Sequence, residues 1–176
     1  MNVLELLMLS GEYIENKEGV VITFSNGKMA KQKHQQYMLL HGILSDGLKE
    51  HNLIVRILNE TIDDVISFLP ESAIEEREFV NALTECVINH VNKTAEEGFE
   101  FFNKNYNGDR KEFAINHKNH KLFGHMTMLF RENSIETIEK SIISRMLVDC
   151  YRYEAAKTYL RKIGFERELK LLENDD

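Results

Sequence analysis

The sequence has few of the residues that cross-link small or exported domains. Only two cysteines, Cys86 and Cys150, occur among the 176 residues, and their spacing suits no metal site. Nothing else in the sequence indicates export, so we expect both thiols to be reduced and buried in a cytoplasmic protein. A disulfide framework and a cysteine-ligated zinc site are not expected.

A membrane span is also missing. The apolar opening, residues 1–10, contains Glu5, lacks a basic leader and is far shorter than the roughly 20 residues that a span requires. We interpret it as part of the folded structure and expect no membrane partner. Internal repeats, low-complexity tracts and Gly-Ser linkers are absent too. Their absence predicts elements that pack against one another.

Positive charge is in deficit. The sequence has 22 Lys and Arg against 29 Asp and Glu, a net charge of -7. General affinity for nucleic acid comes from phosphates meeting Lys and Arg, so the charge argues against a sequence-indifferent polyanion binder. Any RNA contact must therefore be local. Local basic patches exist at Lys28, Lys31 and Lys33, and at Lys104, Arg110, Lys111, Lys118 and Lys121.

The chain divides near His34 into an extended part and a helical part. Gly19–Phe24 is β-branched and aromatic, Ser25-Asn26-Gly27 follows, and residues 28–33 alternate polar with small or apolar side chains. Asn-Gly between two such runs is a strong hairpin signal. We predict a mainly α protein with an N-terminal β-hairpin followed by an all-α helical domain. Because a lone hairpin is marginal in water, we interpret it as the edge of a nucleotidyltransferase sheet whose other strands lie outside this chain.

Helical periodicity continues after the hairpin. Apolar stripes run from Tyr37 to Leu44 and from Leu53 to Leu69, where Pro70 ends the second one. Ser72-Ala-Ile-Glu75 has the pattern of a capping box and predicts the start of a helix that reaches Phe99 or Phe102. Shorter helices are predicted at 110–116, 120–131, 134–147 and 151–163, with Gly164 as a left-handed stop. Core positions are predicted at Cys86, Ile88, Met126, Met128, Leu129 and Phe130.

The hairpin carries the most specific chemical pattern. Alternation along a strand places Lys31 and Lys33 on one face, where two ammonium groups can hold neighbouring phosphate oxygens. Glu18, at the start of the partner strand, can hold a divalent metal or a ribose hydroxyl. This combination predicts phosphoryl or nucleotidyl transfer. The alternative is a solvated hairpin whose charges protect a sheet edge.

The second basic patch places cations beside rings. Its RNA-binding candidates are Arg110, Lys111, Lys118 and Lys121, interleaved with Tyr106, Phe113, His117 and His120. Cations of this kind can meet phosphates while rings stack on unpaired bases; a solvated helix face is the alternative. The three histidines His117, His120 and His125 do not share one helical face, so a histidine metal site is not expected.

Glu18-Gly-Val-Val-Ile22 and Ala30-Lys-Gln-Lys33 resemble the fourth and fifth motifs of the covalent nucleotidyltransferases, the superfamily of ligases and capping enzymes. More narrowly, these motifs resemble the RNA ligase 1 family of T-even bacteriophages, and that resemblance extends patchily over residues 18–131. The further matches are Lys33-x3-Tyr37-x3-His41, Gly108-Asp-Arg-Lys111 and Leu122-Phe-Gly124 with Met128.

The resemblance implies a role for each part of the chain. Glu18 would serve metal and nucleotide binding, and Lys31 and Lys33 would contact the phosphates of ATP, with Mg²⁺ as the metal. Residues 1–34 would be the C-terminal edge of the nucleotidyltransferase domain, carrying its motifs IV and V. Residues 35–176 would be the helical domain that recognises the broken tRNA anticodon loop, in the cytoplasm of a bacterial host.

The sequence departs from this family because it contains no Lys-x-Asp-Gly motif, which supplies the adenylated lysine. The resemblance therefore predicts that the lone chain is inactive and needs an N-terminal ligase fragment as its partner. Two other hypotheses remain, a noncatalytic RNA-binding module and a phage tail-fibre attachment or assembly factor. The family has been tied to fibre attachment as well.

Overall fold

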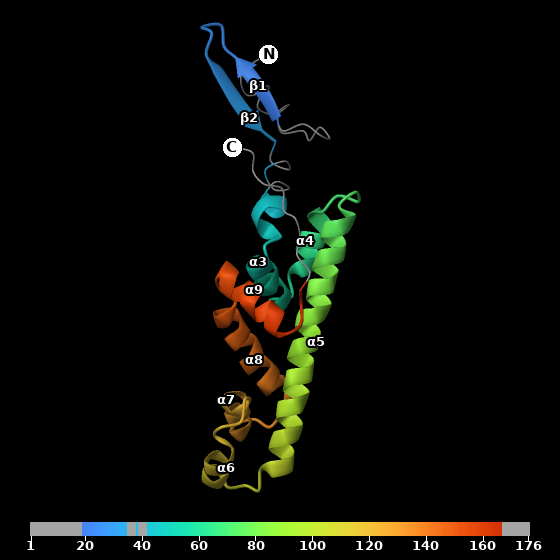
Figure 1. Ribbon diagram of the computed structural model, residues 1–176. Helices are drawn as coiled ribbons and strands as arrows, with labels where there is room; N and C mark the ends of the chain where they lie inside the picture. The colour runs from blue at the N-terminus through green and yellow to red at the C-terminus, as the bar shows by residue number, and fades with distance from the viewer. Residues whose placement is uncertain (1–18, 35–37, 39–41, 167–176) are drawn as a thin grey trace.

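The computed structural model describes residues 19–34, 38 and 42–166. Within them, a two-stranded antiparallel sheet is followed by helices, which confirms the predicted mainly α fold with an N-terminal hairpin (Figure 1). No helix in these ranges is both long enough and apolar enough to cross a bilayer. The apolar opening at residues 1–10 and Glu18 lie outside the described residues.

The hairpin forms where the Asn-Gly signal predicts it. Strands β1 (Gly19–Thr23) and β2 (Met29–Lys33) pair antiparallel. The amide of Phe24 donates to the carbonyl of Lys28 at 2.8 Å, which closes the loop, and Gly27 takes the positive φ of 80° that favours glycine. Figure 1 shows this hairpin beyond one end of the helical body.

The predicted stripe from Leu53 to Leu69 is two helices rather than one. A π-helical turn, η1 (Ile43–Gly47), precedes α3 (Glu50–Leu58), and α4 (Ile62–Phe68) ends before Pro70 as expected. Between α3 and α4, Glu60 has a φ of 58° and the amide of Thr61 donates to the carbonyl of Arg56 at 2.8 Å. This left-handed turn separates the two helices without a glycine or proline, so no local sequence signal predicted it.

The long helix α5 (Ile74–Asn105) begins differently from the prediction. Its N-cap is Ala73 without a side-chain cap hydrogen bond, so the capping box predicted at residues 72–75 is wrong. Arg77 instead donates from the first turn to the carbonyls of Leu69 and Pro70, the latter at 3.2 Å from Nε. The helix is 32 residues long and extends past the predicted end.

The C-terminal helices follow the predicted order. Asp109 and Ser134 are N-caps whose side chains accept backbone hydrogen bonds, and Gly164 has a φ of 91° after the last helix. The single helix expected at 120–131 is a short α-helix followed by a 3-10 turn. The elements are α6 (Arg110–His117), α7 (Phe123–Met126), η2 (Thr127–Phe130), α8 (Ile135–Asp149) and α9 (Tyr153–Lys162).

Helix α5 is the element on which the helical body is assembled. It packs against α3, α7 and α8, and α9 packs on α3 and α8 (Figure 1). The core includes Met126 and Leu129 as predicted, with Phe130 and Cys86 partly buried against it. Ile88 and Met128 are 44% and 42% exposed, so their predicted core positions are wrong. In both cases the apolar stripe is wider than the face that the neighbouring helices cover.

Candidate nucleic-acid interface

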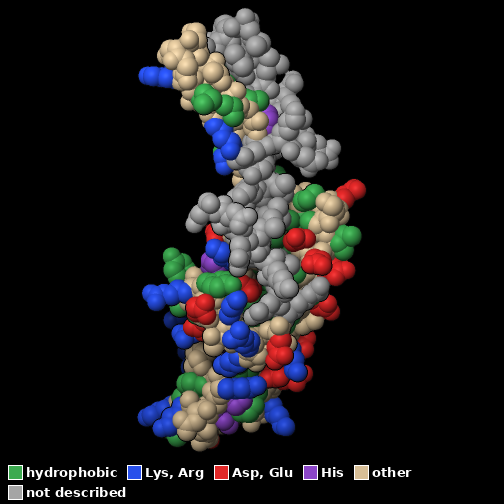
Figure 2. Space-filling view, turned by 45° about the horizontal axis from the view of Figure 1, so that its top comes forward, with side chains coloured by type: hydrophobic (Ala, Val, Ile, Leu, Met, Phe, Trp, Pro, Cys, Tyr) green, Lys and Arg blue, Asp and Glu red, His purple; other side chains and the backbone are tan. Residues whose placement is uncertain are grey.

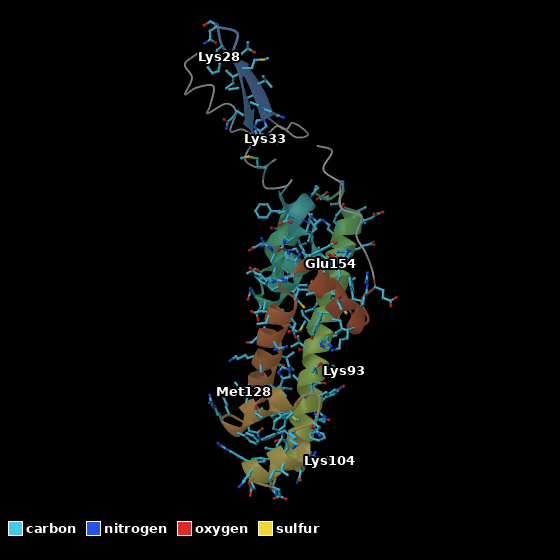
Figure 3. The ribbon with its side chains drawn as sticks, turned by 60° about the vertical axis from the view of Figure 1, so that its left-hand side comes forward. Lys28, Lys33, Lys93, Lys104, Met128 and Glu154 are labelled. Atoms are coloured by element: carbon cyan, nitrogen blue, oxygen red, sulfur yellow. The ribbon has the colours of Figure 1, made fainter. Side chains whose placement is uncertain are left out.

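Lys31 and Lys33 lie two positions apart on the exposed strand β2, so they share one face of the hairpin. Their partners on β1 are Val21 and Gly19. Figure 3 shows Lys33 at the end of the hairpin nearer the helices and Lys28 at the far end, by the turn. The local geometry therefore presents two cations side by side.

Gly19 is required by the close approach of the two strands. A Cβ atom at Gly19 would lie 2.0 Å from the carbonyl oxygen of Gln32 and 2.7 Å from the Cα of Lys33. Any side chain there would collide with backbone. The glycine that follows Glu18 thus has a structural reason, and Glu18 directly precedes the residue paired with Lys33.

The four cations predicted to bind RNA have different surroundings. The Arg110 guanidinium donates to the Phe130 carbonyl and lies 5.6 Å from the centroid of the Phe130 ring. The Nζ of Lys121 lies 2.9 Å from a carboxylate oxygen of Glu97 on α5. Lys111 and Lys118 are exposed at opposite ends of α6. Two of the cations thus hold intramolecular contacts that a phosphate would share or displace.

The rings interleaved with these cations contact one another. Phe113 is 2% exposed and belongs to the core. The His120 ring stacks on Phe101 with centroids 4.2 Å apart, and His117 meets Phe101 edge-on at 5.2 Å. The aromatic cluster fastens α6 and the following loop to the end of α5. Among the residues described, no three His, Cys, Asp or Glu side chains gather as a metal site.

A cavity of about 390 Å³ lies among α5, α7, α8 and α9, and the sequence did not indicate it. Its charged lining consists of Lys121, Arg145, Asp149 and Lys162. Only Lys121 was a predicted site residue. Arg145 and Asp149 are an i,i+4 pair on α8, and Lys162 lies on the next helix, α9; only the packing of these helices brings them to Lys121.

Two histidines contribute hydrogen-bonding groups to this cavity. The Nε2 of His90 lies 3.1 Å from the Tyr159 hydroxyl, and the Nδ1 of His125 lies 3.0 Å from the Ser141 hydroxyl. Burial lowers the pKa of both histidines, and the positive charges of Lys162 and Arg145 lower the pKa values of His90 and His125 further.

The Tyr159 hydroxyl is a stable hydrogen-bonding group of the same cavity. Burial is the largest cause that raises the pKa of Tyr159 to about 12, so the hydroxyl keeps its proton near neutral pH. The lowered histidine pKa values likewise favour uncharged rings at His90 and His125. The cavity thus places uncharged rings beside charged side chains.

No family model, curated protein or solved structure matches this chain. Charge is uneven on the face in Figure 2, where Asp and Glu gather mainly along the right-hand edge and Lys and Arg occupy the centre and left. The candidate interface has two separate parts. The hairpin lysines lie beyond one end of the helical body, whereas α6 of the basic segment 110–121 lies at the other end, and the cavity shares Lys121 with that segment (Figure 1).

Proposed function

We propose that this chain is the C-terminal part of an ATP-dependent RNA ligase that seals 5'-phosphate and 3'-hydroxyl ends in tRNA repair. The observation that carries the proposal is the pair Lys31 and Lys33 on one exposed face of β2, facing a strand that begins with the obligatory Gly19. The proposal includes the cytoplasm of a bacterial host as the place of action.

In the proposed reaction, the lysine that becomes adenylated lies outside these 176 residues, because they contain no Lys-x-Asp-Gly motif. That lysine attacks the α-phosphorus of ATP, and pyrophosphate leaves. The RNA 5'-phosphate takes the AMP group, and the 3'-hydroxyl then attacks this phosphate, releasing AMP and forming the phosphodiester.

Lys31 and Lys33 hold phosphate oxygens and offset the negative charge that develops during each displacement. Two exposed ammonium groups on one strand face suit this task. Mg²⁺ supplies further charge neutralisation when bound, and Glu18 is its proposed protein ligand. The helical residues 35–176 contribute RNA recognition, with Arg110, Lys111, Lys118 and Lys121 as the proposed contacts to the tRNA anticodon-loop ends.

The test is an adenylation and sealing assay with labelled ATP and a tRNA nicked in its anticodon loop. The chain is assayed alone and mixed with the N-terminal fragment of a phage RNA ligase that carries the Lys-x-Asp-Gly motif. We expect sealing in the mixture only, and its loss when Lys31 and Lys33 are both changed to alanine. Lys28→Ala removes one positive charge by the hairpin turn and is the control for a change of charge elsewhere on the hairpin.

Two results would contradict the ligase proposal. Sealing that survives the Lys31→Ala/Lys33→Ala change would remove the hairpin from the chemistry. No sealing in any mixture, together with RNA binding by the chain, would favour a noncatalytic RNA-binding module. Absence of both activities would leave the tail-fibre assembly factor as the hypothesis to test.

A further inference from the structure

The cavity among α5, α7, α8 and α9 has the size and lining of a small-molecule site. Its volume of about 390 Å³ lies in the range of roughly 300–1,000 Å³ that is usual for ligand pockets. Leu122, Ile142 and Met146 give it an apolar wall, and His90 and Tyr159 add two rings. A phosphate ion alone would leave most of this space and the apolar wall without contacts.

Cations are in excess around the cavity although the whole chain has a net charge of -7. Lys121, Arg145 and Lys162 line it against the single carboxylate of Asp149. Arg145 pairs with Asp149 at 3.0 Å. Of the described residues, none provides a carboxylate that forms an ion pair with Lys162.

The existing ion pairs do not prevent a phosphate from binding. The side chains of Lys121 and Arg145 are 71% and 66% exposed, and ion pairs at such exposed positions contribute little to stability. A phosphate offers charge-assisted hydrogen bonds of at least comparable strength, and the planar guanidinium of Arg145 can make two of them. The two lysines and the arginine can therefore turn towards an anion at the cavity mouth.

We propose that this cavity binds one nucleotide of an RNA strand, with the phosphate held by Lys121, Arg145 and Lys162 and the base against His90 and Tyr159. Cations at the mouth suit the phosphate, while rings and an apolar wall suit a heteroaromatic base. The choice of RNA rests on the proposed ligase function. A peptide with phosphoserine or phosphothreonine would match the cations equally well, but its small side chain would not fill the ring-lined part.

The cavity is continuous with the basic segment 110–121. Lys121 belongs to both, and Figure 1 places α6 and α7 together at one end of the helical body, beside the lower part of α8. An RNA strand that contacts Lys111 on α6 and Lys118 at its C-cap would thus reach the cavity by way of Lys121, which lines it. The proposed site therefore adds a pocket for one base to the phosphate contacts of the segment 110–121.

Isothermal titration and NMR of the histidine rings test the proposal with adenosine 5'-monophosphate as the probe. The titrations use the whole chain carrying Lys31→Ala and Lys33→Ala, so that binding at the hairpin does not contribute. We expect saturable binding that shifts the ring signals of His90 and His125. We expect three incomplete probes to bind at least about tenfold more weakly, because each lacks part of the nucleotide. They are inorganic phosphate, adenosine and phosphoserine.

Variants locate the binding. In the same background, Lys162→Ala should weaken nucleotide binding about tenfold, the loss of one strong phosphate contact. Lys140→Ala removes an equal charge from an exposed position on α8 outside the cavity, and it should leave affinity within about twofold. An unchanged far-ultraviolet circular dichroism spectrum of the free Lys162→Ala protein shows that the fold is intact.

Several outcomes would overturn the proposal. The first is equal affinity with and without Lys162→Ala in the Lys31→Ala/Lys33→Ala background, and the second is an equal loss in Lys140→Ala. The others are no nucleotide binding at all, and phosphate or phosphoserine binding as tightly as the nucleotide. The ligase proposal can fail separately, since nucleotide binding is measured without sealing. Nucleotide binding without sealing in any mixture contradicts the ligase alone, whereas sealing without nucleotide binding contradicts the pocket alone.

Discussion

Gly98 on α5 faces Ile138 on α8 so closely that a Cβ atom at Gly98 would lie 2.4 Å from the Cδ1 of Ile138. Ile138 is fully buried. Glycine inside a helix costs roughly 0.5–1 kcal/mol relative to alanine, so its presence in α5 needs a packing reason. The missing side chain at Gly98 allows α8 to approach α5.

Gly98→Ala should therefore destabilise the protein despite the better helix propensity of alanine. We expect a loss of about 1–3 kcal/mol in the free energy of unfolding, measured by urea denaturation, because the core must move to admit the methyl group. Ile138→Val removes the colliding Cδ1, so the double variant should lose less than the sum of the single variants. Gly124→Ala, with no atom within 4 Å of the added Cβ, is the control. A more stable Gly98→Ala protein would contradict the packing argument.

Stability should fall as pH decreases below about 6.5, the ordinary pKa of histidine, because the pKa values of His90 and His125 are lowered in the folded chain. Between the unfolded and the folded pKa values, the unfolded state binds more protons than the folded state. Lowering the pH therefore favours unfolding until the pH falls below the folded pKa values. The positive charges of Lys162 and Lys121 oppose protonation of His90, and Glu97 favours it. For His125, Arg145 opposes protonation and Asp149 favours it.

Thermal unfolding between about pH 7 and about pH 5 measures this effect. The double variant His90→Gln/His125→Gln has no titrating ring at either position, so its melting temperature should decline less over the same interval. Ring titration by NMR should give midpoints below 6.5 for both histidines. Equal pH slopes for wild type and variant would show that other groups control acid stability.

Cys86 and Cys150 should differ in their reaction with a thiol reagent. Cys150 has no exposed surface, and burial chiefly raises its pKa to about 11. Cys86 is only partly buried, although burial raises its pKa too. At neutral pH we expect Cys86 to react in the folded protein and Cys150 to react only as fast as the chain unfolds. Single Cys→Ser variants assign the two phases, and rapid labelling of Cys150 in the folded state would contradict its burial.

Arg110→Ala and Lys111→Ala should separate stability from RNA binding. Arg110 contacts the carbonyl and ring of Phe130, so its loss should cost about 1 kcal/mol of stability as well as weaken RNA binding. Lys111 is exposed, so its loss should leave the melting temperature unchanged and lower the salt dependence of RNA binding by about one phosphate contact. An unchanged salt slope for Lys111→Ala would remove it from the interface.

Short sequence patterns predicted the hairpin turn and the end of α9, each of which depends on a glycine. The hairpin follows from the turn that contains Gly27, and the end of α9 follows from Gly164, because both glycines take positive φ values. The start of α5 was mispredicted because its N-cap, Ala73, has no side-chain cap; Arg77 donates instead to the carbonyls before the helix, and a contact of this kind has no fixed sequence pattern. The break at Glu60 was missed because a non-glycine residue adopts the left-handed conformation there.

The candidate site was predictable only where its residues are near in sequence. Strand alternation predicts that Lys31 and Lys33 share a face, and the structure has this arrangement in β2. The cavity joins Lys121 to Arg145 and Lys162, which lie on separate elements. Their grouping depends on how α8 and α9 pack, and a single sequence does not encode that packing in any local pattern.

The length of α5 has a consequence for how the protein opens. Its 32 residues span roughly 48 Å, and α3, α7 and α8 all pack on it. Buried positions from Val80 to Val91 lie along its middle. Backbone amides there can exchange with deuterium only when several docked helices separate together, so they should be the slowest to exchange in the described chain. All five residues of strand β2 are exposed, so its amides should exchange through local opening, much faster than the amides in the middle of α5.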